Sequence, residues 1–239
     1  MWDALQHGRR SGAASVERLR GLAPFRDLSQ PALTLLAQRS RWRVYRPGEE
    51  VVAAGALDRT VHVVLDGVVC VGGVAPDGRE IVAFFLGPGD VIDVVDLPDV
   101  LLEVTFARPL MAEATVVSVP AEPFRQVEEM HLSLKAELLD QTRRRLYEMA
   151  TLLMDCMFGD AVIRYGHLLG KLGPLYPDQF LTVSHDEIAR LSGMSRSRLE
   201  LVLPRLKKAG YVDYQFGEPG IRILDVDSLV HIENTLGSM

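Results

Sequence analysis

The strongest structural signal in the chain is the stretch 181-LTVSHDEIARLSGMSRSRLELVLPRLKKAG-210. Ser184 and Glu187 have the spacing of a capping box, in which the hydroxyl and the carboxylate satisfy backbone N–H groups that are free at the start of a helix. Gly193 suits the tight turn between two helices, and Ser195 suits the cap of the second helix. The stretch therefore predicts a helix-turn-helix.

The second helix is expected to have an apolar inner face and a polar outer face. Its inner face would contain Leu199, Val202, Leu203 and Leu206. Polar side chains near the N-terminal end of such a helix reach base edges in the DNA major groove, where an arginine can bind guanine O6 and N7. We expect base readout by Ser195, Arg196, Ser197 and Arg198. We expect contacts with the DNA backbone from Ser184, His185, Lys207 and Lys208.

A β-hairpin wing is predicted after this helix. Residues 211–214 and 221–223 have strand character, and the glycines of residues 217–220 provide a turn. An alternative is an amphipathic helical pair that binds no ligand. The agreement of the capping box, the glycine turn, the polar N-terminal face and the wing favours a winged helix-turn-helix that binds double-stranded DNA.

The N-terminal half of the chain has a different texture. Residues 21–125 contain short runs rich in valine that are separated by turns such as Asp66-Gly67 and Gly87-Pro88-Gly89-Asp90. Regularly spaced short strands with such turns predict a β-sandwich or a β-roll of the jelly-roll kind. Together with the helical C-terminal part, this predicts an α+β fold.

A long helix is expected between these parts. No glycine or proline occurs from Phe124 to Cys156, and apolar side chains recur at spacings of three and four residues. This seam consists of Leu139, Thr142, Leu146, Met149, Leu153 and Cys156. Such a seam packs against an identical helix of a second chain or against the chain's own β-rich domain, and we favour the dimer. The predicted divisions are 1–125 with an N-terminal helical arm, 126–158, and 159–239.

Composition restricts the class of protein. The chain has 239 residues, a formal net charge of −6 and two cysteines. No apolar run is long enough to span a membrane, and the N-terminus does not resemble a secretory signal, so we expect a cytoplasmic protein. We find no enzyme motif and no set of residues with metal-ligand spacing, and we predict neither catalysis nor a bound metal.

The whole chain resembles the CRP/FNR superfamily of bacterial transcription regulators from about Leu22 to Leu229. The resemblance depends on the order of short motifs: Pro47-Gly48-Glu49, Gly55, Asp66-Gly67, Asp77-Gly78-Arg79-Glu80, Gly87-Pro88-Gly89-Asp90, Arg144-Arg145-Leu146, Asp160 with Arg164, and Ile188-Ala189 through Gly193-Met194-Ser195-Arg196. It implies a cyclic-nucleotide-binding-like β-roll, a dimerisation helix and a C-terminal winged helix-turn-helix. It also implies a homodimer on a pseudo-palindromic operator, in contact with RNA polymerase.

The sequence departs from the cyclic-nucleotide binders of this family. It lacks their Gly-Glu pair, and Arg108 is followed by Pro109, which has no N–H to donate to a phosphate. Met149-Ala150 stands where a cAMP binder has Thr-Ser. We therefore expect an effector other than cAMP, or none, and take Arg108, Met149 and Ala150 as candidate pocket residues. In the recognition helix, Ser197 stands where Glu is usual, and Leu201 where a second Arg often occurs.

Several alternatives remain open at this point. His62 and Cys70 could ligate haem, although a strand histidine is more often structural, and no cofactor is predicted. Cys156 could form an interchain disulfide rather than pack in the seam. The methionines Met149, Met154 and Met157 could line an apolar effector pocket, although we favour the interpretation that they fill a core. The aspartates between Asp90 and Asp99 could bind a hard cation rather than form a solvated loop. A rival function is a ligand sensor whose winged helix binds a protein partner.

Overall fold

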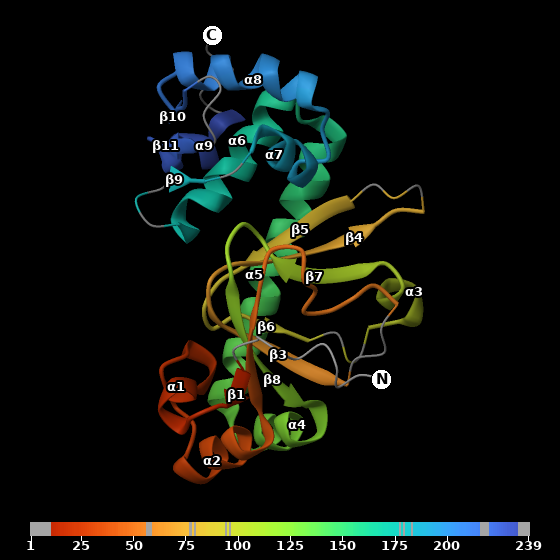
Figure 1. Cartoon of the computed structure of the whole chain (residues 1–239), viewed down its shortest axis with the longest axis vertical. Helices are drawn as coiled ribbons and strands as arrows, with labels where there is room; N and C mark the ends of the chain where they lie inside the picture. The colour runs from red at the N-terminus through yellow and green to blue at the C-terminus, as the bar shows by residue number, and fades with distance from the viewer. Residues whose placement is uncertain are drawn as a thin grey trace. The chain divides into compact units, whose positions relative to one another are not determined.

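The computed structural model describes residues 11–55, 59–76, 78, 80–93, 95, 97–176, 178, 180–182, 184–215 and 220–233. The chain forms two compact units. The first contains the residues up to Val71 and Leu86–Leu146, and the second contains Gly72–Phe85 and the residues from Tyr147 onward. Figure 1 shows the elements of both units. The fold is the predicted α+β type.

The first unit is built on β-strands. A five-stranded sheet has the order β1 (Ser11–Ala13), β2 (Arg41–Tyr45), β8 (Ala114–Pro120), β3 (Thr60–Asp66) and β6 (Val91–Ile92). Separately from this sheet, the chain has a three-stranded sheet with the order β5 (Glu80–Leu86), β4 (Val69–Val74) and β7 (Thr105–Pro109). The predicted turn Asp66-Gly67 joins β3 to β4. Gly67 has a φ of +80°, and a Cβ there would lie 2.6 Å from the carbonyl oxygen of Glu113, so only glycine fits.

Short helices pack together against the five-stranded sheet: α1 (Val16–Arg20), a 3₁₀ turn (Ala23–Phe25), α2 (Gln30–Arg39) and α4 (Ala121–Met130). Another short helix, α3 (Asp99–Leu102), precedes β7 and lies apart from them (Figure 1). The rings of Phe25 and Phe124 meet edge to face with centroids 6.4 Å apart, and both side chains are fully buried. The buried aliphatic side chains of α2 belong to the same core. The N-terminal helical arm of the prediction is therefore part of the first unit.

The expected helix from Phe124 to Cys156 is interrupted at His131. Helix α4 ends at Met130, His131 is extended, and α5 runs from Leu132 to Phe158. The Nδ1 of His131 donates to the carbonyl oxygen of Val127 at 2.9 Å, and its Nε2 is 3.2 Å from the hydroxyl of Ser29. The imidazole thus satisfies a carbonyl at the end of α4. Composition did not reveal this break, because histidine is an ordinary helix residue.

Helix α5 packs on the first unit through one face only. Leu134 is fully buried, and Gln141 is 3% exposed. The amide of Gln141 donates to the carbonyl oxygen of Gly89 at 3.0 Å, and its oxygen accepts from the N–H of Val91 at 3.0 Å. One turn later, Arg145 donates to the carbonyl oxygen of Val91 at 2.6 Å. Polar side chains therefore attach α5 to the strand β6 and to the turn before it.

We predict that Gln141→Leu lowers the free energy of unfolding by about 1–3 kcal/mol, because it leaves a buried N–H and a buried carbonyl without partners. Urea denaturation of the purified protein measures this difference. Lys135→Gln, an exposed change on the same helix, is the control and should change stability by less than about 0.5 kcal/mol. Equal stability of Gln141→Leu and the wild type would contradict the bridging role.

The second unit contains the predicted winged helix-turn-helix. Its helices are α6 (Ala161–Leu172), α7 (His185–Leu191), α8 (Arg196–Lys208) and α9 (Val226–Val230), with a 3₁₀ turn at Gly173–Leu175. A three-stranded sheet has the order β10 (Val212–Asp213), β11 (Ile221–Ile223) and β9 (Phe180–Leu181). The strand β9 and the helix α9 were not predicted. Both complete the small core that supports α8.

Close packing of α6 and the C-terminal segment depends on two glycines. A Cβ at Gly166 would lie 2.5 Å from Cδ1 of Ile232, and one at Gly170 would lie 3.0 Å from Cγ2 of Val230. Helix α6 begins, as predicted, at the cap Asp160, whose carboxylate accepts from the N–H groups of Val162 and Ile163. No helix in the described part of the chain is both long and apolar enough to cross a membrane.

Candidate nucleic-acid interface

The two helices of the helix-turn-helix are capped by serines. The hydroxyl of Ser184 accepts from the N–H of Glu187 at 3.2 Å before α7. The hydroxyl of Ser195 accepts from the N–H of Arg198 at 3.4 Å, with Ser195 in extended backbone geometry before α8. Gly193 in the turn has a φ of +63°, which favours glycine. The sequence therefore specified both caps and the turn.

Helix α8 has the two faces that the sequence predicts. Its four inner aliphatic side chains are buried: Leu199, Val202, Leu203 and Leu206. The four candidate base-reading residues are exposed at its N-terminal end: Ser195, Arg196, Ser197 and Arg198. Burial of the inner face fixes the rotation of the helix about its axis. The candidate residues are consequently presented together on the outside, as an element entering a groove requires.

Arg196 is paired within α8. Its Nε donates to Oε1 of Glu200 at 3.1 Å, and both side chains are more than half exposed. An exposed pair four residues apart contributes little free energy to the helix. A guanine edge could replace Glu200 as the partner of Arg196 at small cost. The carboxylate meanwhile holds the guanidinium beside the outer face of the helix.

The two lysines at the end of α8 differ in their surroundings. Lys207 forms an ion pair with Asp213 at 2.8 Å and donates to the carbonyl oxygen of Tyr214 at 2.6 Å. The side chain of Lys207 lowers the pKa of Asp213 by hydrogen bonding and charge. Lys207 therefore connects α8 to the start of the wing, a structural role that the sequence analysis did not anticipate. Lys208 is exposed at the same end of the helix.

Parts of the predicted interface lie outside the described residues. The backbone of His185 begins α7, but its side chain is among those that the structure does not describe. Residues 216–219 of the wing turn are also outside the described ranges. The wing strands themselves pair antiparallel, with Val212 opposite Ile223 and Asp213 opposite Arg222.

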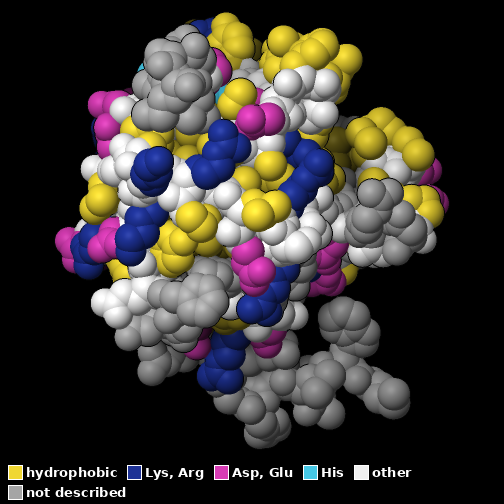
Figure 2. All heavy atoms as spheres, turned by 90° about the horizontal axis from the view of Figure 1, so that it is seen from above, with side chains coloured by type: hydrophobic (Ala, Val, Ile, Leu, Met, Phe, Trp, Pro, Cys, Tyr) yellow, Lys and Arg dark blue, Asp and Glu magenta, His cyan; other side chains and the backbone are white. Residues whose placement is uncertain are grey.

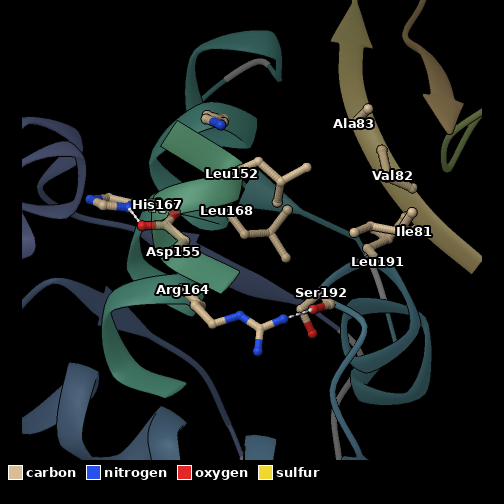
Figure 3. A pocket seen from close by; sticks show the side chains of 11 residues that line it. Ile81, Val82, Ala83, Leu152, Asp155, Arg164, His167, Leu168, Leu191 and Ser192 are labelled. Carbon is tan, nitrogen blue, oxygen red and sulfur yellow. Dashed lines mark hydrogen bonds and ion pairs between the residues drawn. The ribbon is translucent and has the colours of Figure 1, made fainter. Parts of the chain in front are cut away.

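Two side chains of α6 make polar contacts with the helix-turn-helix and with the elements around it (Figure 3). Arg164 on α6 donates to the carbonyl oxygen of Ser192 at 3.2 Å, next to the turn glycine. His167 lies between two carboxylates, with Nδ1 2.8 Å from Asp155 and Nε2 2.9 Å from Glu233. Asp155 near the end of α5 is 8% exposed. These polar contacts join α5, α6 and the C-terminal segment within the second unit, beside a cavity of about 40 Å³ with room for a few water molecules only.

The predicted effector residues are not brought together by a described cavity. Arg108 on β7 stacks its guanidinium 4.4 Å above the ring of Phe106 in the first unit. Met149 and Ala150 are exposed on α5 in the second unit. None of the three lines the 40 Å³ cavity. None lines a groove of about 500 Å³ in the first unit, between β6, α4 and the first half of α5. Their role as a pocket stays a prediction.

The burial and the contacts of single residues bear on the alternative roles that the sequence left open for them. His62 is buried, and its Nδ1 is 2.9 Å from the hydroxyl of Ser118 on the neighbouring strand, as in a structural histidine. Cys70 is buried and Cys156 is exposed. Met154 and Met157 are exposed, so the expectation that they fill the chain's own core is wrong. Asp93 forms an ion pair with Arg125 at 2.7 Å. The described residues contain no group of three side chains placed to hold a metal ion.

The predicted seam of α5 is exposed along its length. All six of its residues are exposed: Leu139, Thr142, Leu146, Met149, Leu153 and Cys156. Leu146 is 66% exposed and Leu153 is 59% exposed. The seam therefore does not pack on the chain's own β-structure, because that contact uses the opposite face of α5.

The charge on the face that bears α8 is not one continuous patch. Figure 2 shows Lys and Arg side chains separated from each other, with hydrophobic side chains and some Asp and Glu between them. Phosphate contacts depend on local cations rather than on net charge, so the net charge of −6 does not conflict with this surface.

We predict that Lys208→Ala weakens binding to all duplexes alike and reduces the slope of log K against log salt. A dimer that loses two phosphate contacts should show a slope smaller by about two. Lys207→Ala, the matched variant, should change the slope by less, because its ammonium is paired with Asp213. Fluorescence anisotropy at several salt concentrations measures both. An unchanged slope for Lys208→Ala would remove this lysine from the interface.

Comparisons with known proteins agree with this geometry. Residues 42–131 match the family of the cyclic nucleotide-binding domain, and residues 150–232 match the Crp-like helix-turn-helix domain. A CRP-like cAMP-activated global transcriptional regulator from Mycobacterium tuberculosis is 26% identical over 195 residues, covering 79% of this chain and 87% of that protein.

Solved structures share the fold. FixK2 from Bradyrhizobium japonicum superposes with a TM-score of 0.65 at 18% identity, over 80% of this chain and 95% of FixK2. A CooA mutant from Carboxydothermus hydrogenoformans has a TM-score of 0.65 at 16% identity, over 93% of this chain and 97% of that protein. The c-di-GMP responsive regulator CLP of Xanthomonas campestris has a TM-score of 0.63 at 23% identity, over 82% of this chain and 100% of that protein.

Proposed function

Because this chain belongs to the CRP/FNR superfamily of transcription regulators, we propose that it acts as a homodimer that reads a pseudo-palindromic operator with its two α8 helices. The observation that carries this proposal is α8 itself, whose buried inner face leaves Ser195, Arg196, Ser197 and Arg198 exposed together. Two such helices about 34 Å apart enter successive major grooves.

We assign a separate role to each of three consecutive parts of the chain. Residues 1–125 would form a sensor, 126–158 a dimerisation helix and 159–239 the DNA-binding domain. Contact with RNA polymerase and action in the cytoplasm are part of the same proposal. Ser184 and His185 at the start of α7, with Lys208, would position the DNA backbone. Lys207 would contact the DNA backbone only if a phosphate replaced Asp213 as the partner of its ammonium group.

We propose an effector other than cAMP, or no obligatory effector. The relative from Mycobacterium tuberculosis is described as cAMP-activated, but this chain lacks the Gly-Glu pair and has Pro109 after Arg108. Asp93 in the corresponding segment already pairs with Arg125. An anionic cyclic phosphate would have to displace this carboxylate to reach Arg125, and it would lack the N–H that Pro109 does not have.

The exposed seam of α5 supports the dimer. Leu146→Glu is expected to place two like charges opposite each other in the dimer and to produce monomers. Analytical ultracentrifugation measures the change, and Tyr147→Glu on the neighbouring position of α5 serves as the comparison. A dimer of unchanged stability in Leu146→Glu would show that the chains associate through another surface.

Arg196→Ala is expected to lower specific binding by about 1–3 kcal/mol through loss of a bidentate base contact. Glu200→Gln, which removes the negative charge beside Arg196 without removing the guanidinium, should retain specific binding. The measurement is anisotropy on the operator and on a scrambled duplex. Equal losses on both duplexes would refute the assignment of Arg196 to base readout.

Selection from a pool of random duplexes at physiological salt tests the function as a whole. The proposal expects an enriched two-fold symmetric site without added ligand if no effector is obligatory, and with cell extract if one is. The rival function, a winged helix that binds a protein partner, is favoured by the acidic net charge of −6. It expects no enriched site under either condition.

A further inference from the structure

One side chain on the outer face of α8 contrasts with its surroundings. Leu201 is 72% exposed, although it lies in the middle of a 13-residue helix whose other leucines are buried. A leucine stabilises a fold mainly when its side chain is buried, and the side chain of Leu201 is not. The fold of the second unit therefore does not account for a leucine at this position.

The neighbours of Leu201 are mostly polar or cationic. Residues three and four positions apart share a helix face, so Ser197 and Arg198 precede Leu201 on its face, Pro204 and Arg205 follow it, and Lys208 lies about one turn further on. All five are exposed. Leu201 thus lies between the candidate base-reading end of α8 and the cations at its C-terminal end. A surface with this arrangement places the leucine against a polyanion rather than against an apolar protein partner.

We infer that Leu201 reads the C5-methyl group of a thymine in each half-site. This inference rests on the proposed function, because it needs α8 in the major groove. Thymine is the base that presents an apolar group there, and aliphatic contact with it is a mode of direct readout. Arg205 would contact a phosphate beside the groove, while Leu201 lies against the base edges next to the base-reading Arg198. Leu201 thereby adds selection for a T·A pair to the guanine contact of Arg196.

Deoxyuridine tests the inference, because it differs from thymidine only by the missing methyl group. The full-length protein is titrated by anisotropy with its selected operator and with duplexes in which one thymine per half-site is replaced by deoxyuridine. At one position the wild type should lose affinity about four-fold for one half-site and about 15-fold for both, the effect of removing one buried methyl group from each. Leu201→Ala should bind the thymine operator more weakly and be insensitive to deoxyuridine at that position.

Leu224→Ala is the matched control, because Leu224 is also exposed in the second unit but lies outside α8. It should retain the wild-type sensitivity to deoxyuridine. Thermal unfolding confirms that each variant is folded. Two results would overturn the inference while leaving the proposed function intact: a wild type indifferent to deoxyuridine at every thymine, or Leu201→Ala as sensitive as the wild type. Selection that yields no operator at all would overturn both.

Discussion

Burial of the inner face of α8 is the constraint on which the candidate interface depends. Leu199, Val202, Leu203 and Leu206 are almost completely removed from solvent. Side chains of this size each contribute about 1.5–3 kcal/mol when fully buried. Rotation of α8 about its axis would expose them, so the helix keeps one orientation on its support. This orientation determines which side chains of α8 are exposed on its outer face.

Polar contacts at both ends of α8 refine the position that burial sets. Ser195 caps the N-terminus, and Lys207 attaches the C-terminal turn to the wing through Asp213. Arg164 holds the preceding turn through the carbonyl oxygen of Ser192. Each contact is small by itself, since exposed ion pairs and single hydrogen bonds contribute about 1 kcal/mol or less. Together they restrict the movement of α8 relative to its support.

Helix α5 uses its two faces for different purposes. Gln141 and Arg145 attach one face to the backbone of Gly89 and Val91. The opposite face carries the exposed seam. In the second unit the same helix ends near Asp155, which His167 binds. One continuous helix thus makes polar contacts with β6 through Gln141 and Arg145, and with α6 through Asp155.

The sequence by itself determined the elements whose causes are local. Ser184, Ser195, Asp160 and Gly193 act through the backbone within three or four residues, and the leucine spacing of α8 follows from helix geometry. The tertiary structure alone decided contacts between residues distant in the chain. His131 interrupts the predicted helix, where it caps α4 and lies within hydrogen-bond distance of Ser29. Lys207 forms an ion pair with Asp213 of the wing. No local pattern encodes such pairs, because each partner is supplied by the fold.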